Sequence, residues 1–469
     1  MAENIREIAL DTLLVLEREK EYSDRLIRAV LDKYDYLETR DKAFLKRLTE
    51  GTLERQLELD YYLDQVSSVP VPKMKPLIRC LMRMSLYQML YMDTVPDSAA
   101  CNEACKLVAK RGVGSLRGFV NAVLRKLSRE KASLTLPDRE SEPIRYLSVK
   151  YSMPRWIVEL WLEEYGMDIA ETVMSGLMQV HPVSLRFRTD LTPERMESLC
   201  EEIISTGASL AESAYLPYSR TLTNAASIDR LPGFTQGFFT VQDVSSALAV
   251  EAADICPKDF VVDACAAPGG KSLLAAEKAA KVLSRDISPE KTELIRESAA
   301  RMNARNIQIQ VFDAAVEDEA LIESADIVLL DVPCSGLGVI GKKRDIKYRV
   351  TPQDLKDLRV LQRQIVNTCS KYVRPGGILI YSTCTINPGE NEEMVRYITD
   401  HLPFTPDSLD NLLPQKVLED REHVEQLRRQ YSKESSVPLN ELESSACIQL
   451  LPGYMEGDGF FIARFRHKP

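Results

Sequence analysis

The chain has 469 residues, of which 45% are apolar, 28% charged and 7% aromatic, a composition typical of a globular protein with about two to four domains. This composition excludes a disordered chain, a collagen-like repeat and a small disulfide-bonded scaffold. The formal net charge of −10 argues against nucleic-acid binding by the chain as a whole, because contacts with phosphate groups require Lys and Arg.

The first residues of the sequence mix apolar side chains with Glu3, Arg6, Glu7 and Asp11, which argues against a signal peptide. A membrane-spanning segment is not expected either, because no run of about 18 apolar residues occurs. The ten cysteines form no CxxC pair, and only four histidines are present. We therefore expect a cytoplasmic protein with reduced thiols, no membrane contact and no metal site.

Residues 1 to about 130 carry apolar side chains at helical spacing, such as Ile5, Ile8 and Leu13, and this spacing predicts a succession of helices. Within this region residues 101–131 are basic, with eight Lys or Arg residues against two Glu residues, a local charge of +6. In an acidic protein such a segment favours contact with nucleic acid, and an ordinary solvated helix face is the alternative. The basic residues are Lys106, Lys110, Arg111, Arg117, Arg125, Lys126, Arg129 and Lys131.

The rest of the sequence changes character twice. Residues 132–145 are polar and contain two prolines, which predicts a linker, and residues 146–240 mix helical and strand-like segments as a small α+β module would. From residue 241 on, short apolar strands alternate with helices, the pattern of a parallel, doubly wound sheet. Residues 402–445 are polar and acidic and predict a surface insertion.

Polar or reactive residues stand at or just after the ends of several predicted strands. They are Asp263, Asp286, Asp313, Asp331 and Cys384. Ligands of doubly wound sheets bind at the carboxyl ends of the strands. We therefore expect the functional site at this edge of the sheet.

The segment DACAAPGGKS, from Asp263 to Ser272, joins a predicted strand to a predicted helix. Its glycines let the backbone approach a ligand, and a helix N-terminus favours polar or anionic groups. A phosphate-binding P-loop would require GxxxxGK[ST], but Cys265 stands where the first glycine belongs. An adenosyl ligand is the alternative, with Asp286, 16 residues after Gly270, in place to hold ribose hydroxyls.

Two cysteine motifs follow the next buried strands. DVPCSG places Cys334 three residues after Asp331, and YSTCT places Cys384 after the following predicted strand. Alone, each cysteine would be interpreted as a small core residue. At the ends of successive parallel strands, however, both thiols can face one crevice, and this arrangement favours a role in catalysis.

The motifs DACAAPGGKS, DVPCSG and YSTCTINPGENE resemble those of the bacterial RNA cytosine-5 methyltransferases of the Nop2/Sun/Fmu family, and VQDVSSAL and DGFFIARFRHK are similar to that family too. The N-terminal helices resemble the NusB-like RNA-binding domain of the Sun-type enzymes, which act on a cytosine of 16S ribosomal RNA. The resemblance implies an α/β fold class with a Rossmann-like class I methyltransferase core. It implies a NusB-like all-α RNA-binding domain at 1–135, a small α+β RNA-binding module at 146–240 and the catalytic domain at 241–469.

The resemblance also implies a reaction that uses S-adenosylmethionine and no metal. A thiolate that adds to carbon 6 of cytosine makes carbon 5 nucleophilic toward the methyl group. The resemblance assigns this attack to Cys384, assigns Cys334 to product release, and places Asp331 at the cytosine edge. It assigns S-adenosylmethionine to the glycine loop and the strand ends, at Cys265, Ala266, Ala267, Pro268, Gly269, Gly270, Lys271, Asp286, Asp313 and Asp331.

Alternative functions compete with this interpretation. They are methylation of a transfer RNA, a non-catalytic RNA-binding or antitermination role with a decayed enzyme domain, and a P-loop NTPase; the intact Cys334 and Cys384 argue against decay. With 16S ribosomal RNA as its expected partner, the protein is expected to be a monomer. Residues 342–363, with a local charge of +5, predict a second basic surface beside the site. Arg285, directly before Asp286, departs from the family pattern.

Overall fold

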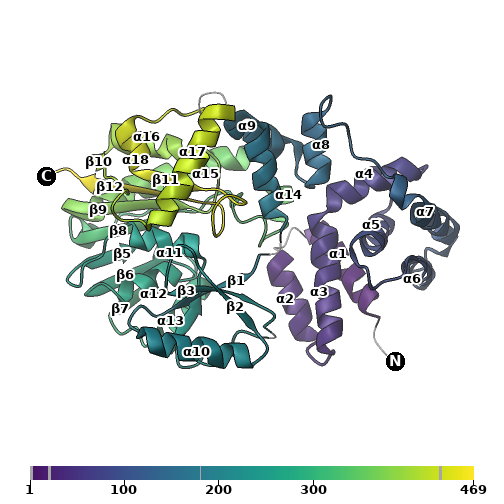
Figure 1. Cartoon of the computed structure of the whole chain (residues 1–469), viewed down its shortest axis with the longest axis horizontal. Helices are drawn as coiled ribbons and strands as arrows, with labels where there is room; N and C mark the ends of the chain where they lie inside the picture. Colours follow the sequence, from purple (N-terminus) through teal and green to yellow (C-terminus); the bar gives the residue numbers. More distant parts are fainter. Residues whose placement is uncertain (1–3, 20–22, 180, 226, 432–435) are drawn as a thin grey trace. The chain divides into compact units, whose positions relative to one another are not determined.

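The structure is a computed structural model of the whole chain and describes residues 4–19, 23–179, 181–225, 227–431 and 436–469. Two compact units are present (Figure 1). Unit 1 consists of residues 1–161 and 342–349, and unit 2 of residues 162–341 and 350–469. The division into three domains stays a prediction. None of the helices in the described ranges is at once long enough and apolar enough to cross a membrane.

Unit 1 is all-helical, as the sequence predicts. It contains α1 (Ile5–Glu19), α2 (Ser23–Lys33), α3 (Thr39–Glu54), α4 (Gln56–Val66), α5 (Pro76–Tyr91), α6 (Asp97–Lys110), α7 (Arg117–Glu130), α8 (Pro143–Lys150), the first residues of α9 (Arg155–Leu177), and α14 (Ile346–Arg349), with short 3₁₀ turns at Val71–Lys73, Gly114–Leu116 and Lys131–Ser133.

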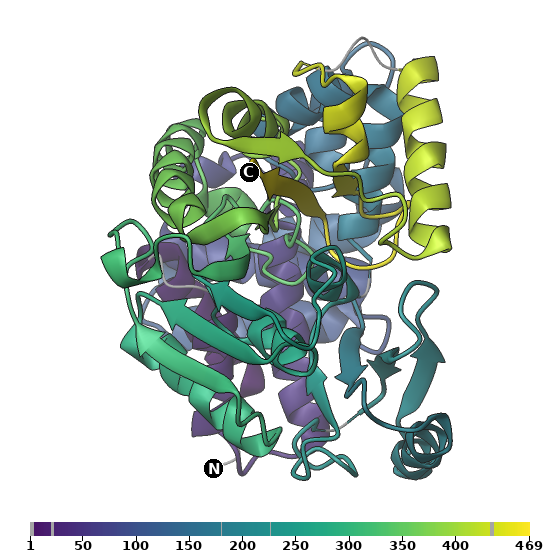
Figure 2. The same cartoon turned by 90° about the vertical axis from the view of Figure 1, so that its left-hand side faces the viewer.

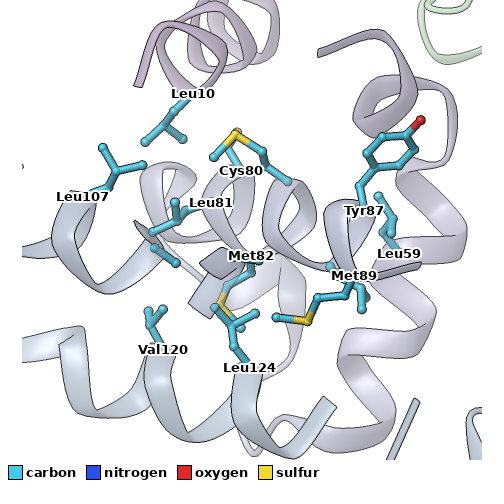
Figure 3. Packing of buried hydrophobic residues seen from close by; sticks show 14 of the residues in the cluster. Leu10, Leu59, Cys80, Leu81, Met82, Tyr87, Met89, Leu107, Val120 and Leu124 are labelled. Atoms are coloured by element: carbon cyan, nitrogen blue, oxygen red, sulfur yellow. The ribbon is translucent and has the colours of Figure 1, made fainter. Parts of the chain in front are cut away.

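Helix α5 is the centre of unit 1 and contacts α1, α3, α4, α6 and α7. Every residue from Cys80 to Met89 is buried, as expected for a helix that is covered on all sides. Leu81 and Met82 lie among apolar side chains of the surrounding helices (Figure 3). At Gly51 of α3 an added Cβ would lie 2.0 Å from the Tyr87 hydroxyl oxygen, so only glycine permits this close approach of α3 to α5.

The segment 342–349 lies between the DVPCSG and YSTCT motifs in the sequence but packs within unit 1. The Asp345 carboxylate accepts hydrogen bonds from the backbone N–H of Ser23 at 3.0 Å and from its hydroxyl at 2.6 Å. Because Ser23 is the first residue of α2, this carboxylate supplies an acceptor at the positive end of the helix. The Tyr348 hydroxyl donates to the Glu54 carbonyl at 3.0 Å, at the end of α3.

Two cations of this segment are bound to other groups of unit 1. Lys347 is fully buried, donates to the Tyr151 carbonyl at 3.4 Å, and has a pKa that burial lowers to about 7. Arg344 forms an ion pair with Glu54 at 3.0 Å. The interpretation of 342–363 as a basic surface is therefore wrong for Lys347 and Arg344, because a local excess of charge does not tell whether its side chains find partners inside the protein.

Replacement of Lys347 by Met is predicted to stabilise the protein increasingly as the pH falls from about 10 to about 7. Buried Lys347 binds its proton only near pH 7, whereas in the unfolded chain it does so near its ordinary pKa of 10.5. Between these values the unfolded state binds more protons, so each pH unit of acidification lowers the wild-type stability by up to about 1.4 kcal/mol relative to the variant. Urea denaturation at pH 8 and pH 9.5 measures this; an equal stability difference at both pH values would contradict it.

Unit 2 contains a large mixed sheet in the order β10-β12-β9-β8-β5-β6-β7, and β11 pairs with β12. Strands β5 to β9 are parallel, whereas β10, β11 and β12 pair antiparallel. This confirms the predicted Rossmann-like core. The strands are β5 (Phe260–Asp263), β6 (Lys281–Asp286), β7 (Ile307–Val311), β8 (Ala325–Asp331), β9 (Val373–Thr383), β10 (Phe404–Pro406), β11 (Cys447–Leu450) and β12 (Phe460–His467).

Helices cover both faces of this sheet (Figure 2). Because side chains alternate along a strand, Val261 and Ile327 join one apolar cluster with α11, α12 and α17, while Val262 and Val328 join another with α15 and α16. The helices of unit 2, after the remainder of α9, are α10 (Pro193–Ser205), α11 (Val244–Glu251), α12 (Gly270–Ala276), α13 (Pro289–Arg301), α15 (Pro352–Cys369), α16 (Glu392–His401), α17 (Gln415–Tyr431) and α18 (Glu441–Ser445).

Two other parts of unit 2 bear on the sequence predictions. A small antiparallel sheet in the order β2-β3-β1-β4 agrees with an α+β module; its strands are β1 (Val183–Phe187), β2 (Ser209–Glu212), β3 (Ser219–Thr223) and β4 (Phe239–Val241). Residues 402–445 are not a mere surface insertion. Their described part, residues 402–431 and 436–445, supplies β10, α17 and α18, and Leu413 and Val417 are buried in the apolar cluster on one face of the large sheet.

Candidate functional site

The candidate site lies where the strand order of the large sheet reverses. The chain runs from β5 outward to β6 and β7, then crosses to β8 and continues to β9 on the other side. Such a reversal opens a crevice at the carboxyl ends of the strands. Asp263, Asp286 and Asp331 are the last residues of β5, β6 and β8, and Cys384 directly follows β9. The structure thus places these residues at one edge of the sheet.

The glycine loop occupies the turn between β5 and α12. Gly269 has φ +105°, a left-handed conformation that favours glycine, and an added Cβ would lie 3.1 Å from Ile295. Gly270 begins α12, and a Cβ there would lie 3.1 Å from Gln242. The loop therefore packs closely against its neighbours at the start of α12, where free backbone N–H groups favour polar or anionic ligands.

Asp286 is buried beside this loop. Its two carboxyl oxygens accept hydrogen bonds from the backbone N–H groups of Ala267 at 3.2 Å and Ser288 at 3.0 Å. Each carboxylate oxygen has a second lone pair, so Asp286 can still accept hydroxyl groups of a ligand. Asp313, after β7, accepts from the Ala315 N–H at 2.9 Å.

Arg285 has a structural role that its sequence position did not reveal. Its guanidinium donates to the Gln310 side-chain oxygen at 2.8 Å and to the Asp318 carboxylate at 2.5 Å. It also lies 4.1 Å from the centre of the Phe312 ring, a cation–π distance. Arg285 thereby joins β6 to β7 and to the loop that follows β7.

Lys271 and Asp331 are held together at the ends of α12 and β8. The Lys271 ammonium donates to one carboxyl oxygen of Asp331 at 2.6 Å, and the Ser382 hydroxyl donates to the other at 3.0 Å. The same ammonium lies 5.0 Å from the centre of the Phe460 ring. These contacts fix the orientation of the Asp331 carboxyl group at the crevice.

Asp263 is fully buried below the loop. It accepts a hydrogen bond from the Ser272 hydroxyl at 2.6 Å, and burial raises its pKa to about 7. Cys265 is partly buried against the apolar cluster of Val262 and Leu330, and burial raises its pKa as well. Cys265, one of the predicted cofactor residues, therefore packs its side chain against the apolar core.

The two predicted catalytic cysteines lie side by side. Asp331 of β8 is the register partner of Ser382 of β9, so the loops that follow them leave the sheet next to each other. The sulfur atoms of Cys334 and Cys384 are 3.2 Å apart. A hydrogen bond with the Cys384 thiol, burial, and the charges of Glu390 and Asp331 raise the pKa of Cys334, which keeps this residue a thiol.

Sequence reasoning gave no role to Glu390, although it lies within the YSTCTINPGENE motif. The carboxylate is fully buried and bonded to Ser335, next to Cys334. Its only signal in the sequence is an acidic residue six positions after Cys384, a spacing that does not by itself predict burial. Among the described residues, no group of three or more His, Cys, Asp or Glu side chains is placed to hold a metal ion.

Comparisons with known proteins bear on both units. Residues 251–466 match the family described as 16S rRNA methyltransferase RsmB/F, and residues 3–129 match the NusB family. The chain is 34% identical to a probable ribosomal RNA small subunit methyltransferase B of Bacillus subtilis (strain 168), and the match covers 99% of each chain. It is 31% identical to a protein of the same description from Synechocystis sp., over 98% of this chain and 99% of the relative. The crystal structure of PH0851 has a similar fold, with a TM-score of 0.75 at 23% identity over 99% of both chains.

Proposed function

Because the chain belongs to the 16S rRNA methyltransferase RsmB/F family, we propose that it transfers a methyl group from S-adenosylmethionine to carbon 5 of a cytosine in 16S ribosomal RNA. The observation that carries this proposal is the pair of Cys334 and Cys384 sulfur atoms 3.2 Å apart beside the glycine loop. The names of its relatives support ribosomal RNA as the substrate class. The protein acts in the cytoplasm, as a monomer.

The glycine loop and its neighbours fit S-adenosylmethionine. When bound, this cofactor supplies an electrophilic methyl group. The backbone of residues 265–271 and the N-terminus of α12 would hold it, and the remaining lone pairs of Asp286 would accept the ribose hydroxyls. By the resemblance to the family, Asp313 would lie near the adenine and Asp331 near the methionine end. A P-loop function lacks support because Cys265 stands in place of the first required glycine.

The two cysteines have different roles in the reaction of the cytosine. The sulfur of Cys384 adds to carbon 6 of the ring, which makes carbon 5 nucleophilic. The resemblance to the family gives Cys334 a different task, and its hydrogen bond with the Cys384 thiol and its burial raise its pKa. Asp331, oriented by Lys271 and Ser382, hydrogen-bonds the cytosine edge. After methyl transfer a base takes the proton from carbon 5, and Cys334 assists the release of Cys384.

Two alternatives have less support. The relatives are named for the small ribosomal subunit, which favours 16S ribosomal RNA over a transfer RNA. A non-catalytic RNA-binding or antitermination factor would have no need to keep two thiols 3.2 Å apart at the crevice. We therefore retain the methyltransferase as the proposal.

Helix α7 carries the cations that are best placed to bind RNA. Four of the eight basic residues of 101–131 are engaged in ion pairs, which join Lys106 to Glu103, Lys110 and Arg111 to Glu7, and Lys131 to Asp97. The structure shows no ion pair with a described residue for the other four, Arg117, Arg125, Lys126 and Arg129. Arg117, Arg125 and Arg129 follow the four-residue spacing that places side chains on one helix face, and all three are exposed.

We predict that replacement of Arg117, Arg125 and Arg129 by Gln weakens binding to 16S ribosomal RNA and lowers the slope of log affinity against log salt by about 2–3, because each lost phosphate contact removes close to one released counterion. The matched control replaces the ion-paired Lys106, Lys110 and Arg111 by Gln and changes the net charge equally. Titration at several salt concentrations measures both variants. Equal slopes for the two variants would argue that α7 is not the contact surface.

Asp286→Ala is expected to weaken S-adenosylmethionine binding by about 1–3 kcal/mol, the cost of ribose hydroxyls without a partner. Asp400→Ala, at an exposed position of α16, is the control and should leave the affinity unchanged. Calorimetry with S-adenosylmethionine compares the two variants. An unchanged affinity for Asp286→Ala would rule out the ribose role.

The roles of the two cysteines predict opposite outcomes in one experiment. With S-adenosylmethionine and 16S ribosomal RNA, Cys334→Ala should accumulate a covalent RNA adduct, because attack and methyl transfer proceed but release does not. Cys384→Ala should form no adduct, because it lacks the nucleophile. A denaturing gel shows the adduct as a slowly migrating protein band. If the band instead appears with Cys384→Ala and not with Cys334→Ala, the two roles are exchanged.

A further inference from the structure

We propose that Glu390 is a positioning residue of the proposed methyl transfer, one that holds the loops of Cys334 and Cys384, and with them the two sulfur atoms, in fixed positions while Cys384 attacks. The inference rests on the proposed function. It assigns a task to a buried carboxylate that touches neither of the two reacting sulfur atoms.

Glu390 binds the loop of Cys334 through the backbone N–H and the hydroxyl of Ser335. One carboxyl oxygen accepts the backbone N–H of Ser335 at 2.9 Å, and the other accepts the Ser335 hydroxyl at 2.5 Å. Gln362 of α15 donates to Glu390 at 2.9 Å and, through the same amide nitrogen, to the Pro333 carbonyl at 2.9 Å. The residues on both sides of Cys334 are therefore tied directly or through one amide to this carboxylate.

The same carboxylate reaches the Cys384 loop. The Ser335 hydroxyl is 2.8 Å from the hydroxyl of Thr385, the residue after Cys384. Asn387, two residues further on, donates to Glu390 at 2.9 Å. Glu390 thus stands between two loops that leave β8 and β9 and whose sulfur atoms are 3.2 Å apart.

The neighbours of the Glu390 carboxyl group indicate whether it is ionised or protonated. The four groups that contact the Glu390 oxygens are a backbone N–H, a hydroxyl and two amide nitrogens, and all four donate. A protonated carboxyl would direct its own hydrogen at one of these donors, whereas an ionised carboxylate only accepts. The network therefore suits a buried negative charge, which these hydrogen bonds stabilise.

This charge acts on Cys334. The titratable groups around Cys334 are Cys384, Glu390, Asp331 and Tyr381. Lys271 pairs with Asp331 and so offsets that charge. On α15 the nearby Arg359 pairs with Glu393. The hydrogen bond with Cys384 and burial are the largest causes of the raised pKa of Cys334, and the charge of Glu390 adds to them. Among the described residues no cation is bonded to Glu390, so its charge opposes a thiolate at Cys334.

The test compares Glu390→Gln with Glu393→Gln, a matched control that removes the partly exposed carboxylate three residues further along the chain. Diamide, which takes one hydrogen from each of two thiols and leaves a disulfide, serves as a probe of the sulfur spacing. Mass spectrometry of digested protein follows the joined peptides of Cys334 and Cys384. Alkylation of Cys334 by iodoacetamide between pH 6 and 10 reports its protonation. Neither readout involves RNA or methyl transfer, so a failure here is distinct from a failure of the proposed function.

In the wild type and in Glu393→Gln we expect rapid joining of Cys334 to Cys384. In Glu390→Gln joining should slow by about tenfold, since an amide cannot accept all four hydrogen bonds. The pH profile of Cys334 alkylation should also move to lower pH, a change that loss of packing alone would not produce. Joining and pH profiles equal to those of the wild type would overturn the proposal.

A second variant covers the case in which Glu390→Gln does not fold, as judged by its melting transition and its binding of S-adenosylmethionine. Ser335→Ala removes the hydroxyl link between the loops but keeps the carboxylate. It should slow the joining of Cys334 to Cys384 while leaving the pH profile of Cys334 in place. An unchanged rate of joining in Ser335→Ala would overturn the proposal that Glu390 positions the two loops through Ser335.

Discussion

The parallel pairing of β8 with β9 is the constraint on which the rest of the site depends. The register that sets Asp331 opposite Ser382 makes the two following loops leave the sheet together, and motifs 50 residues apart in the chain place their sulfur atoms 3.2 Å apart. Lys271 and Ser382 orient Asp331 at the same edge. A slip of one residue in this register would turn the side chains to the other face and separate the groups that the chemistry requires.

Much of the fold could be predicted because local patterns and the final packing agree. From residue 241 on, the predicted alternation of short apolar strands with helices is found: Phe260–Asp263 and Ala325–Asp331 are strands with alternate residues in the two apolar clusters, and Pro289 begins α13. Local sequence patterns were less informative where proline and glycine occur inside a strand. Strand β9 starts at Val373 and runs through Pro375, Gly376 and Gly377, residues that usually interrupt a strand, and its irregular register with β8 there accommodates them.

The candidate site shows a similar limit. Strand ends predicted where Asp286, Asp331 and Cys384 would gather, because parallel strands share one carboxyl edge. Sequence could not reveal partners that come from distant segments. Arg285 pairs with Asp318, and Lys347 is buried within the helical unit. Glu390, in the loop after β9, accepts a hydrogen bond from Ser335 in the loop after β8. Charge patterns give the sign of a segment but not the groups that neutralise it, so these contacts required the structure.

The proposed methyl transfer requires a covalent bond between the sulfur of Cys384 and a cytosine of 16S ribosomal RNA. The most direct measurement is mass spectrometry of the adduct formed by Cys334→Ala with S-adenosylmethionine and 16S ribosomal RNA, after digestion with ribonuclease and trypsin. If Cys384 is the nucleophile, we expect a methylated cytidine remnant on the peptide of Cys384. A remnant on any other residue, or a remnant on a base other than cytosine, would contradict it.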